Sequence, residues 1–161
     1  MSGNYDIQQV CENGHQVIGC YSIRAEKRQD FCQKCGARTI IACPTCKKEI
    51  QGDRIQTDWG GNWNSIESAD VPSFCRNCGE PYPWTKNKIM TAVQTFVEFG
   101  NLDENEKKTI EEDISNIARD VPQTELSARR LNRIWKKCGN VGYELIMEFA
   151  SRTAAKVLKN P

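Results

Sequence analysis

Apolar residues in the C-terminal half recur every three or four positions between residues 85 and 158, which is the spacing of one face of an α-helix. The pattern is interrupted at Gly100, Pro122 and Gly139, residues that end helices. It therefore predicts about four helices with short connections, packed as a small antiparallel bundle. The four apolar stripes comprise Ile89, Ala92, Val93, Phe96 and Val97; Ile110, Ile114, Ile117 and Val121; Leu126, Leu131, Ile134, Trp135 and Cys138; and Leu145, Ile146, Phe149, Ala150, Val157 and Leu158.

Two of these helices carry start signals. Asp103, with Glu106 three residues later, fits a capping box that opens the second helix. Thr124, followed by Glu125, is expected to cap the third. The fourth is expected to run from residue 143 to 158, and its broad apolar face fits either a buried central helix or a surface for homo-oligomerisation.

The N-terminal half shows short runs with strand character. They cover residues 5–10, 16–18, 39–42 and 50–57, the last read as one arm of a hairpin. About 84 residues with so little aliphatic content cannot bury enough apolar surface to fold unaided. This half therefore needs an additional staple.

Cysteine pairs supply that staple. Cys32 and Cys35 form one Cys-x-x-Cys turn. Cys43 and Cys46 form another, and seven residues separate the two turns. Such a turn directs two thiolates at one metal, and a second pair completes a tetrahedral zinc site. Phe74-Cys75-Arg76-Asn77-Cys78-Gly79 repeats the pattern of the first turn. The predicted second site is therefore Cys43, Cys46, Cys75 and Cys78.

The partners of Cys32 and Cys35 must lie upstream, where Cys11 precedes the only histidine, His15, by four residues. That step lets both side chains reach one metal, which predicts a first site of Cys11, His15, Cys32 and Cys35. Cys20 is the alternative fourth ligand. It is nine residues from Cys11, beyond the expected turn, and its other interpretation is a small buried apolar residue.

Composition supports bound zinc over disulfides. The chain has 161 residues and nine cysteines, an odd number whose spacing suits metal. The first residues form neither a basic nor an apolar segment of a secretory signal. No apolar run approaches the roughly 20 residues of a membrane span. These features predict two zinc ions, a cytoplasmic location and no membrane span.

The residues of common catalytic sites are missing. The single histidine is assigned to zinc, which leaves none for a Ser-His-Asp or Cys-His pair. There is no Gly-x-x-x-x-Gly-Lys phosphate loop. A catalytic zinc usually keeps one position for water, whereas both predicted sites are closed by four protein ligands. We therefore expect that the protein is not an enzyme.

Two sets of residues are candidates for binding a partner. Trp59 and Trp63 flank a Gly-Gly turn, and they form either a mini-core, the favoured interpretation, or an exposed contact for a peptide or base. On the third helix, Arg129, Arg133 and Lys137 lie with Arg130 and Lys136 off the apolar stripe. They form either a solvated face or a nucleic-acid contact.

The overall charge disfavours bulk nucleic acid. The chain has 22 Lys and Arg against 21 Asp and Glu. Residues 1–84 contain nine basic and ten acidic side chains. Zinc sites with three and four thiolates add about −1 and about −2 to that half. The N-terminal half is therefore expected to be acidic.

Five motifs together resemble a family of small bacterial proteins of unknown function that carry a paired zinc ribbon and a helical tail. They are Cys-x-Asn-Gly-His from Cys11, Phe-Cys-x-Lys-Cys-Gly from Phe31, Cys-Pro-x-Cys from Cys43, Phe-Cys-x-Asn-Cys-Gly from Phe74, and Pro-Tyr-Pro-Trp-Thr from Pro81. The resemblance is close over residues 5–85 and extends in character over the helical remainder. It implies the ligand set including His15 and a bacterial cytoplasmic home, and it implies no activity.

The sequence as a whole predicts an α+β protein. Residues 1–84 are expected to form a tandem zinc ribbon of short hairpins and knuckles, and residues 85–161 a helical bundle. The function expected from these features is that of a non-enzymatic zinc-binding adaptor or interaction protein with a protein partner. The alternative is a nucleic-acid-binding regulator that uses the basic face of the third helix.

Overall fold

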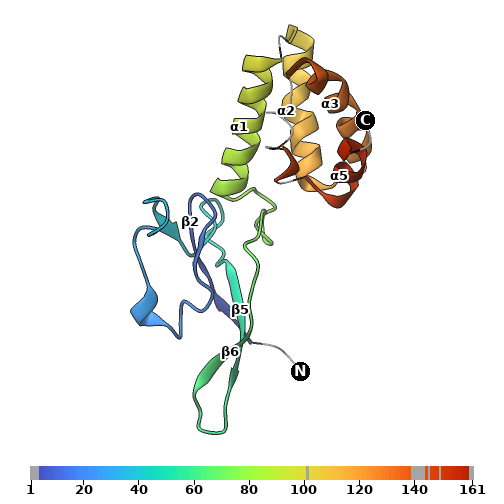
Figure 1. Cartoon of the computed structure of the whole chain (residues 1–161). Coiled ribbons are helices and arrows are strands. Elements are labelled where there is room, and N and C mark those ends of the chain that lie inside the picture. The colour runs from blue at the N-terminus through green and yellow to red at the C-terminus, as the bar shows by residue number, and fades with distance from the viewer. Residues whose placement is uncertain (1–3, 101, 139–143, 145, 149, 160–161) are drawn as a thin grey trace. The chain divides into compact units, whose positions relative to one another are not determined.

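The computed structural model of the chain describes all residues except 1–3, 101, 139–143, 145, 149 and 160–161 (Figure 1). The side chains of Phe99 and of residues 135–138 are also not described. The architecture is α+β, as predicted. Six short strands form two small antiparallel sheets in the N-terminal part, and four described helices follow in the C-terminal part. The chain divides into two compact units, Met1–Thr85 and Lys86–Pro161.

The first unit contains two three-stranded sheets. The strand order of one is β1-β5-β6 and that of the other is β3-β2-β4. The strands are β1 (Asn4–Ile7), β2 (Gln9–Cys11), β3 (Gln16–Ile18), β4 (Thr39–Ile40), β5 (Gln51–Thr57) and β6 (Trp63–Glu67), with one 3-10 turn, η1 (Ala25–Lys27).

The predicted strand over residues 5–10 is split between the two sheets. Gln8 lies between β1 and β2, and its backbone N–H donates to the Ile50 carbonyl at 3.0 Å. Its side-chain amide donates to the carbonyls of Gln51 at 2.7 Å and Asp70 at 3.0 Å. Gln8 is fully buried. Its hydrogen bonds hold the junction between β1 and β2 against the beginning of β5.

The first unit has a small core. Its buried members are Val10, Cys43, Ile50, Cys75, Tyr82 and Trp84. The rings of Tyr82 and Trp84 are stacked with centroids 4.7 Å apart, and the Trp84 indole donates to the Pro72 carbonyl at 2.9 Å. The expected mini-core of Trp59 and Trp63 is therefore wrong. Trp59 is fully exposed and Trp63 is 43% exposed, in keeping with β6, all of whose residues are exposed.

The second unit is helical. Its helices are α1 (Pro83–Phe99), which begins in the first unit, α2 (Glu104–Arg119), α3 (Thr124–Cys138) and α5 (Arg152–Lys159). The core comprises Ala92, Phe96, Leu102, Ile110, Ile114, Ile117, Ala128, Leu131, Ile134, Ile146, Ala154 and Leu158.

Two predicted helix boundaries are confirmed. The Gly100 N–H bonds to the Phe96 carbonyl at 2.8 Å where α1 ends. At the start of α2, an Asp103 carboxylate oxygen accepts from the N–H groups of Asn105 and Glu106, both at 2.8 Å. The Glu106 carboxylate accepts in return from the Asp103 N–H at 3.1 Å, which completes the capping box.

The other predictions for the helices need correction. Thr124 is itself the first residue of α3 rather than the residue before it, and its hydroxyl donates to the Asn116 carbonyl of α2 at 2.8 Å. Leu131 and Ile134 of the predicted α3 stripe are buried as expected, but Leu126 is 51% exposed and the unpredicted Ala128 is buried. Trp135 and Cys138, which were assigned to that stripe, have side chains outside the described part.

The single helix predicted over residues 143–158 is interrupted. Residues 150 and 151 are not helical. The Ser151 hydroxyl accepts from the Ala154 N–H at 3.2 Å at the start of α5, which is the local bond that favours a helix start over helix continuation. The broad apolar face predicted for a single helix over residues 143–158 is therefore divided at residues 150 and 151. Of its members, Leu145 and Phe149 lie outside the described residues.

A buried carboxylate links α2 to α3. The side chain of Asp113 is 1% exposed, and one of its oxygens accepts from the Ser127 hydroxyl at 2.7 Å and from Arg130 at 3.3 Å. Its other oxygen, Oδ2, has no partner among the described residues. Burial raises the pKa of Asp113 from its ordinary value of 3.8, because the interior disfavours the charged form.

This buried carboxylate predicts a pH-dependent contribution to stability. A pKa raised in the folded state gives stability that is fully present below the unfolded pKa and is lost as the pH rises through the folded pKa. The difference in unfolding free energy between wild type and Asp113→Asn, measured by urea denaturation, should therefore be more favourable to wild type at about pH 3.5 than at about pH 7. The opposite trend would show that Arg130 outweighs burial.

Candidate metal centres

Three turns of one kind hold six of the cysteines. In each, the carbonyl of the first cysteine accepts from the N–H of the residue four positions later, and its N–H donates to the carbonyl of the residue after that. The residue directly after the second cysteine of each turn has positive φ: 70° at Gly36, 61° at Lys47 and 73° at Gly79. Glycine adopts that conformation without strain, so the sequence signal is clear in the first and third turns, and Lys47 shows that it is not obligatory.

A fourth turn presents Cys11 and His15. The Gly14 N–H donates to the Cys11 carbonyl at 2.8 Å and the Cys11 N–H donates to the His15 carbonyl at 3.0 Å. Gly14 has φ of 86°, and a Cβ there would lie 3.0 Å from the Cβ of Trp84. Both the backbone conformation and the close approach of Trp84 therefore require glycine at this position.

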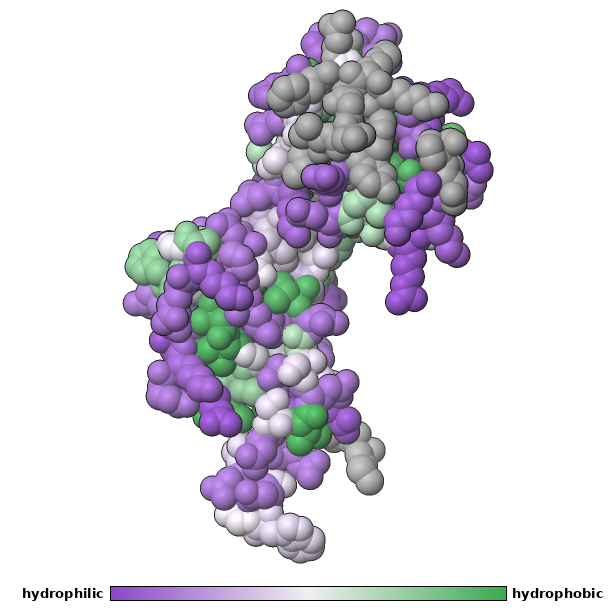
Figure 2. All heavy atoms as spheres, in the orientation of Figure 1, coloured by the Kyte–Doolittle hydropathy of each residue, from purple (hydrophilic) through white to green (hydrophobic). Residues whose placement is uncertain are grey.

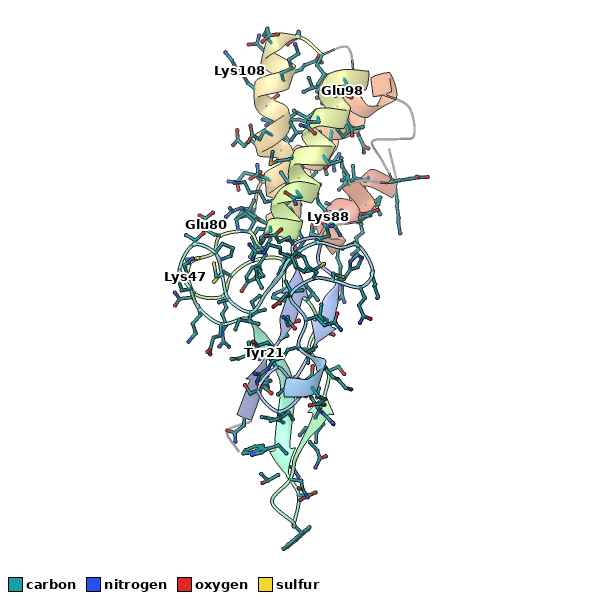
Figure 3. The ribbon with its side chains drawn as sticks, turned by 90° about the vertical axis from the view of Figure 1, so that its left-hand side faces the viewer. Tyr21, Lys47, Glu80, Lys88, Glu98 and Lys108 are labelled. Carbon is teal, nitrogen blue, oxygen red and sulfur yellow. The ribbon has the colours of Figure 1, made fainter. Side chains whose placement is uncertain are left out.

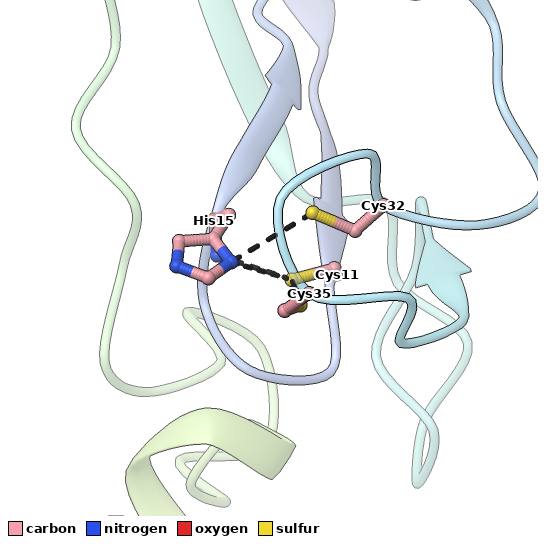
Figure 4. A group of neighbouring side chains, drawn as sticks. All are labelled: Cys11, His15, Cys32 and Cys35. Atoms are coloured by element: carbon pink, nitrogen blue, oxygen red, sulfur yellow. Dashed lines mark hydrogen bonds between the residues drawn. The ribbon is translucent and has the colours of Figure 1, made fainter.

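The first group comprises Cys11, His15, Cys32 and Cys35, whose ligand atoms all lie within 4.8 Å of one another. Nδ1 of His15 is 3.5 Å from the sulfur of Cys11 and 3.7 Å from that of Cys32, and the sulfurs of Cys11 and Cys35 are 3.7 Å apart (Figure 4). Tetrahedral zinc, with bonds of about 2.3 Å to sulfur and about 2.0 Å to nitrogen, requires edges of roughly 3.8 and 3.5 Å. The observed separations therefore fit zinc, with Nδ1 as the histidine donor.

The second group comprises Cys43, Cys46, Cys75 and Cys78, again within 4.8 Å. The sulfurs of Cys43 and Cys78 are 3.7 Å apart, and those of Cys46 and Cys75 are 3.6 Å apart. A disulfide would need about 2.05 Å. Four sulfurs at these separations match the edges of a four-thiolate zinc site.

Backbone and amide N–H groups point at several of the sulfurs. The His15 N–H lies 3.3 Å from the Cys11 sulfur, and the Asn13 side-chain amide lies 3.4 Å from that of Cys35. The Ala37 N–H lowers the pKa of Cys35 to about 6. A metal binds the thiolate rather than the thiol, so donors aimed at sulfur favour the form that coordinates.

The second group has the same kind of donor. The Asn77 N–H lies 3.4 Å from the Cys75 sulfur. Burial raises the pKa of Cys75, but the N–H groups of Cys78 and Asn77 oppose burial and leave that pKa at about 6. The first cysteine of each Cys-x-x-Cys turn is buried, while Cys35 and Cys78 are exposed. Each group therefore has buried donors on one side and an exposed cysteine on the other.

Cys20 belongs to neither group. Its buried thiol donates to the Asp53 carboxylate at 3.2 Å, which also accepts from the Ser65 hydroxyl at 3.0 Å and the Ala69 N–H at 2.9 Å. Burial, with the Asp53 carboxylate, raises the pKa of Cys20 to about 11. Cys20 is therefore a small buried residue and not a substitute metal ligand. No signal in the sequence near Cys20 predicts Asp53 as its hydrogen-bond partner.

The family comparison covers almost the whole chain. A model of a bacterial family described as "uncharacterized protein conserved in bacteria (DUF2321)" matches residues 4–158. The chain belongs to DUF2321. The match includes all eight residues of the two metal groups and, except for Lys159 at the end of α5, the four described helices of this DUF2321 member. It confirms the resemblance drawn from the cysteine motifs. No curated protein and no solved structure matches the chain.

None of the other candidate binding residues that the structure describes belongs to either metal group. Trp59 and Trp63 are at the turn end of the β5–β6 hairpin. On α3, Arg129 is paired with Glu125 at 2.7 Å, Arg133 is exposed, and the side chain of Lys137 lies outside the described part. None of the described helices is long and apolar enough to cross a membrane.

The geometry predicts which mutation removes a metal. His15→Ala should lower the zinc content from about two ions to about one per chain, because it deletes one of four donors. Cys20→Ser should keep both ions, since its thiol contacts Asp53. Elemental analysis of protein purified without added metal measures both, and loss of zinc in Cys20→Ser with retention in His15→Ala would reassign the fourth ligand.

Metal removal should act on the two units differently. The first unit has the smaller core and two metal groups, so a strong chelator should erase its dispersed NMR signals. The helical unit has its own core and caps, and most of the far-ultraviolet helical signal should persist. Simultaneous loss of both signals would show a single cooperative unit.

Proposed function

We propose that this DUF2321 member is a non-enzymatic adaptor in which two structural zinc ions hold a ribbon module that binds a partner protein. The ion is assigned as zinc because four donors at tetrahedral spacing, three or four of them thiolates, suit zinc. Free thiolates in such sets need a reducing compartment, which supports a cytoplasmic location.

The observation that carries the adaptor role is the exposed tryptophan turn of the β5–β6 hairpin. Trp59 is fully exposed and Trp63 is 43% exposed. Tryptophan is enriched at interfaces, where one large rigid side chain buries much apolar surface. On the face shown in Figure 2, the end of the hairpin is pale, while much of the surface around it is hydrophilic.

The turn that presents these residues is ordered. The Asp58 N–H donates to the Asn62 carbonyl at 2.9 Å, and the Asp58 carboxylate accepts from the N–H groups of Gly60 and Asn62, both at 2.9 Å. The Asn62 N–H lowers the pKa of Asp58, so the carboxylate keeps these bonds at neutral pH. An ordered turn loses less conformational entropy on binding than a mobile one.

The chemistry of the metal groups supports a structural role. Each group has four protein donors, and a catalytic zinc would usually have three plus water. The nucleic-acid alternative draws less support, because Glu125 partly neutralises Arg129 and Asp113 contacts Arg130. Nucleic-acid binding is therefore the alternative result of the partner-capture experiment below.

Two variants test the adaptor role. Trp59→Ser with Trp63→Ser should abolish capture of the endogenous partner by the tagged full-length protein, with both zinc ions retained. Phe31→Ser is the matched control, because Phe31 is another exposed aromatic of the same unit. The alternative is tested with random DNA. If the wild type binds it with a steep salt dependence, and the triple variant Arg129→Glu, Arg133→Glu and Lys137→Glu does not, the protein is a nucleic-acid-binding regulator and the adaptor role fails.

The same double variant predicts a stability contrast. Because neither indole is buried, its unfolding free energy should fall by less than about 1 kcal/mol. Trp84→Ala should cost about 3–5 kcal/mol, as truncations of buried aromatics do. Chemical denaturation measures both, and equal losses would mean that the hairpin indoles are packed in solution.

A further inference from the structure

The outer edge of β6 lacks a backbone partner within the described residues. β6 pairs antiparallel with β5 only, and all five of its residues are exposed. The hairpin also extends beyond β1, whose pairing with β5 runs from Gln51 to Ile55 and stops before the turn (Figures 1 and 3). The opposite edge of the sheet differs, because the Tyr21 N–H donates to the Ile7 carbonyl of β1 at 2.8 Å.

The hydrogen-bond pattern shows which groups of β6 face outward. Asp58 and Asn62 face each other across the turn through a backbone bond of 2.9 Å. Facing pairs of an antiparallel ladder alternate between bonded and non-bonded types. The next pairs are Thr57 with Trp63, Gln56 with Asn64, and Ile55 with Ser65. Trp63 and Ser65 are therefore of the non-bonded type, and their N–H and C=O groups point to the free edge.

The first three residues of β6 have none of the features that usually block pairing. Natural edge strands carry lysine, proline, other charges or a bulge that prevents another strand from adding. β6 reads Trp-Asn-Ser-Ile-Glu. Its charge, Glu67, and its bulge both lie after Ser65, since Ser65 pairs with Ile55 and Glu67 with Arg54, which leaves Ile66 as the extra residue. Residues 63–65 thus form a regular, open edge.

The charge around this edge defines the ligand. No Lys or Arg occurs between Arg54 and Arg76, whereas Asp58, Glu67 and Asp70 lie within that interval. Arg54 partly neutralises Glu67 across the strands at 3.7 Å, so Asp58 and Asp70 are the acidic side chains of the interval that form no ion pair within the described residues. Exposed Trp63 and Ile66 provide apolar surface, and an indole face also attracts cations. A complementary strand would carry apolar side chains together with Lys or Arg.

We propose that the outer edge of β6 binds an extended segment of a partner protein, which adds as a fourth strand and carries apolar and basic side chains. This mode, in which main-chain bonds give affinity and side chains give selectivity, is a general one for peptide recognition. The inference rests on the proposed adaptor function and specifies its contact. The excess of acidic side chains disfavours pairing with a second copy of this edge and disfavours an anionic bilayer.

Ser65 provides a matched pair of variants. Ser65→Pro removes the outward N–H and leaves the bonds to β5, since that N–H faces the free edge. It also removes the bond between the Ser65 hydroxyl and Asp53. Ser65→Ala removes the same side-chain bond and keeps the N–H, so the difference between the two variants isolates the edge.

The probe is a library of random peptides of about twelve residues, selected on the zinc-loaded full-length protein and measured by fluorescence anisotropy. We expect selected peptides with alternating apolar residues and Lys or Arg. Ser65→Pro should weaken binding by about tenfold or more, and Ser65→Ala by less than about twofold, because one lost main-chain bond also leaves its acceptor unpaired. Hydrogen exchange at the Trp63 and Ser65 amides should slow when peptide binds.

Several results would overturn the proposal. Selection of acidic peptides, equal binding by both Ser65 variants, or unchanged exchange at Trp63 and Ser65 would each exclude strand addition. A dimer that Ser65→Pro dissociates would assign the edge to a second copy. Trp59-dependent binding to phosphatidylcholine–phosphatidylglycerol vesicles in place of peptide would assign the hairpin to a membrane.

The two levels of proposal remain separable. If Ser65→Pro still captures the endogenous partner but the double tryptophan variant does not, strand addition fails and the adaptor role stands. If neither variant loses the partner, the hairpin is not the contact, and both proposals fail.

Discussion

The convergence of eight cysteine and histidine donors into two groups that could each hold a metal ion is the constraint on which the first unit is built. Its buried apolar cluster has six members, and two of them, Cys43 and Cys75, belong to the second metal group. Trp84 packs on Gly14 of the first group's turn and stacks on Tyr82. The core and the metal groups are therefore one structure, and a unit with so few aliphatic residues has no second source of comparable stability.

Metal coordination at these groups, as proposed, would also free the rest of the ribbon from forming a core. A hairpin that must close a hydrophobic core turns its large side chains inward, whereas the β5–β6 hairpin carries Trp59, Trp63 and Ile66 outward. Its turn is held by Asp58 through local hydrogen bonds instead of by packing. The proposed division of roles, in which metal holds the fold and the hairpin makes the contact, rests on this difference.

The parts of the structure that could be predicted from the sequence are those fixed by local constraints. A Cys-x-x-Cys turn places two sulfurs by itself, and Asp103 with Glu106 forms its capping box within four residues. The missed features depend on distant partners. The exposure of Trp59, the bond between Cys20 and Asp53, and the Thr124 bond to Asn116 follow from which segments meet in space. On α3, Ala128 and Leu131 are buried and Leu126 is exposed. The spacing of apolar residues along the helix does not by itself decide which of them face the core.

The exposed indoles and the open edge of β6 are most informative in combination. Either feature alone occurs at protein surfaces without a role, since much of a folded surface is apolar and each sheet has edges. Here both occur on one ordered hairpin, and in a sheet whose other edge receives a bond from Tyr21. An unblocked strand beside exposed apolar residues favours aggregation unless another chain covers it. Its presence in an otherwise hydrogen-bonded ribbon is therefore best explained by a partner that supplies the missing strand.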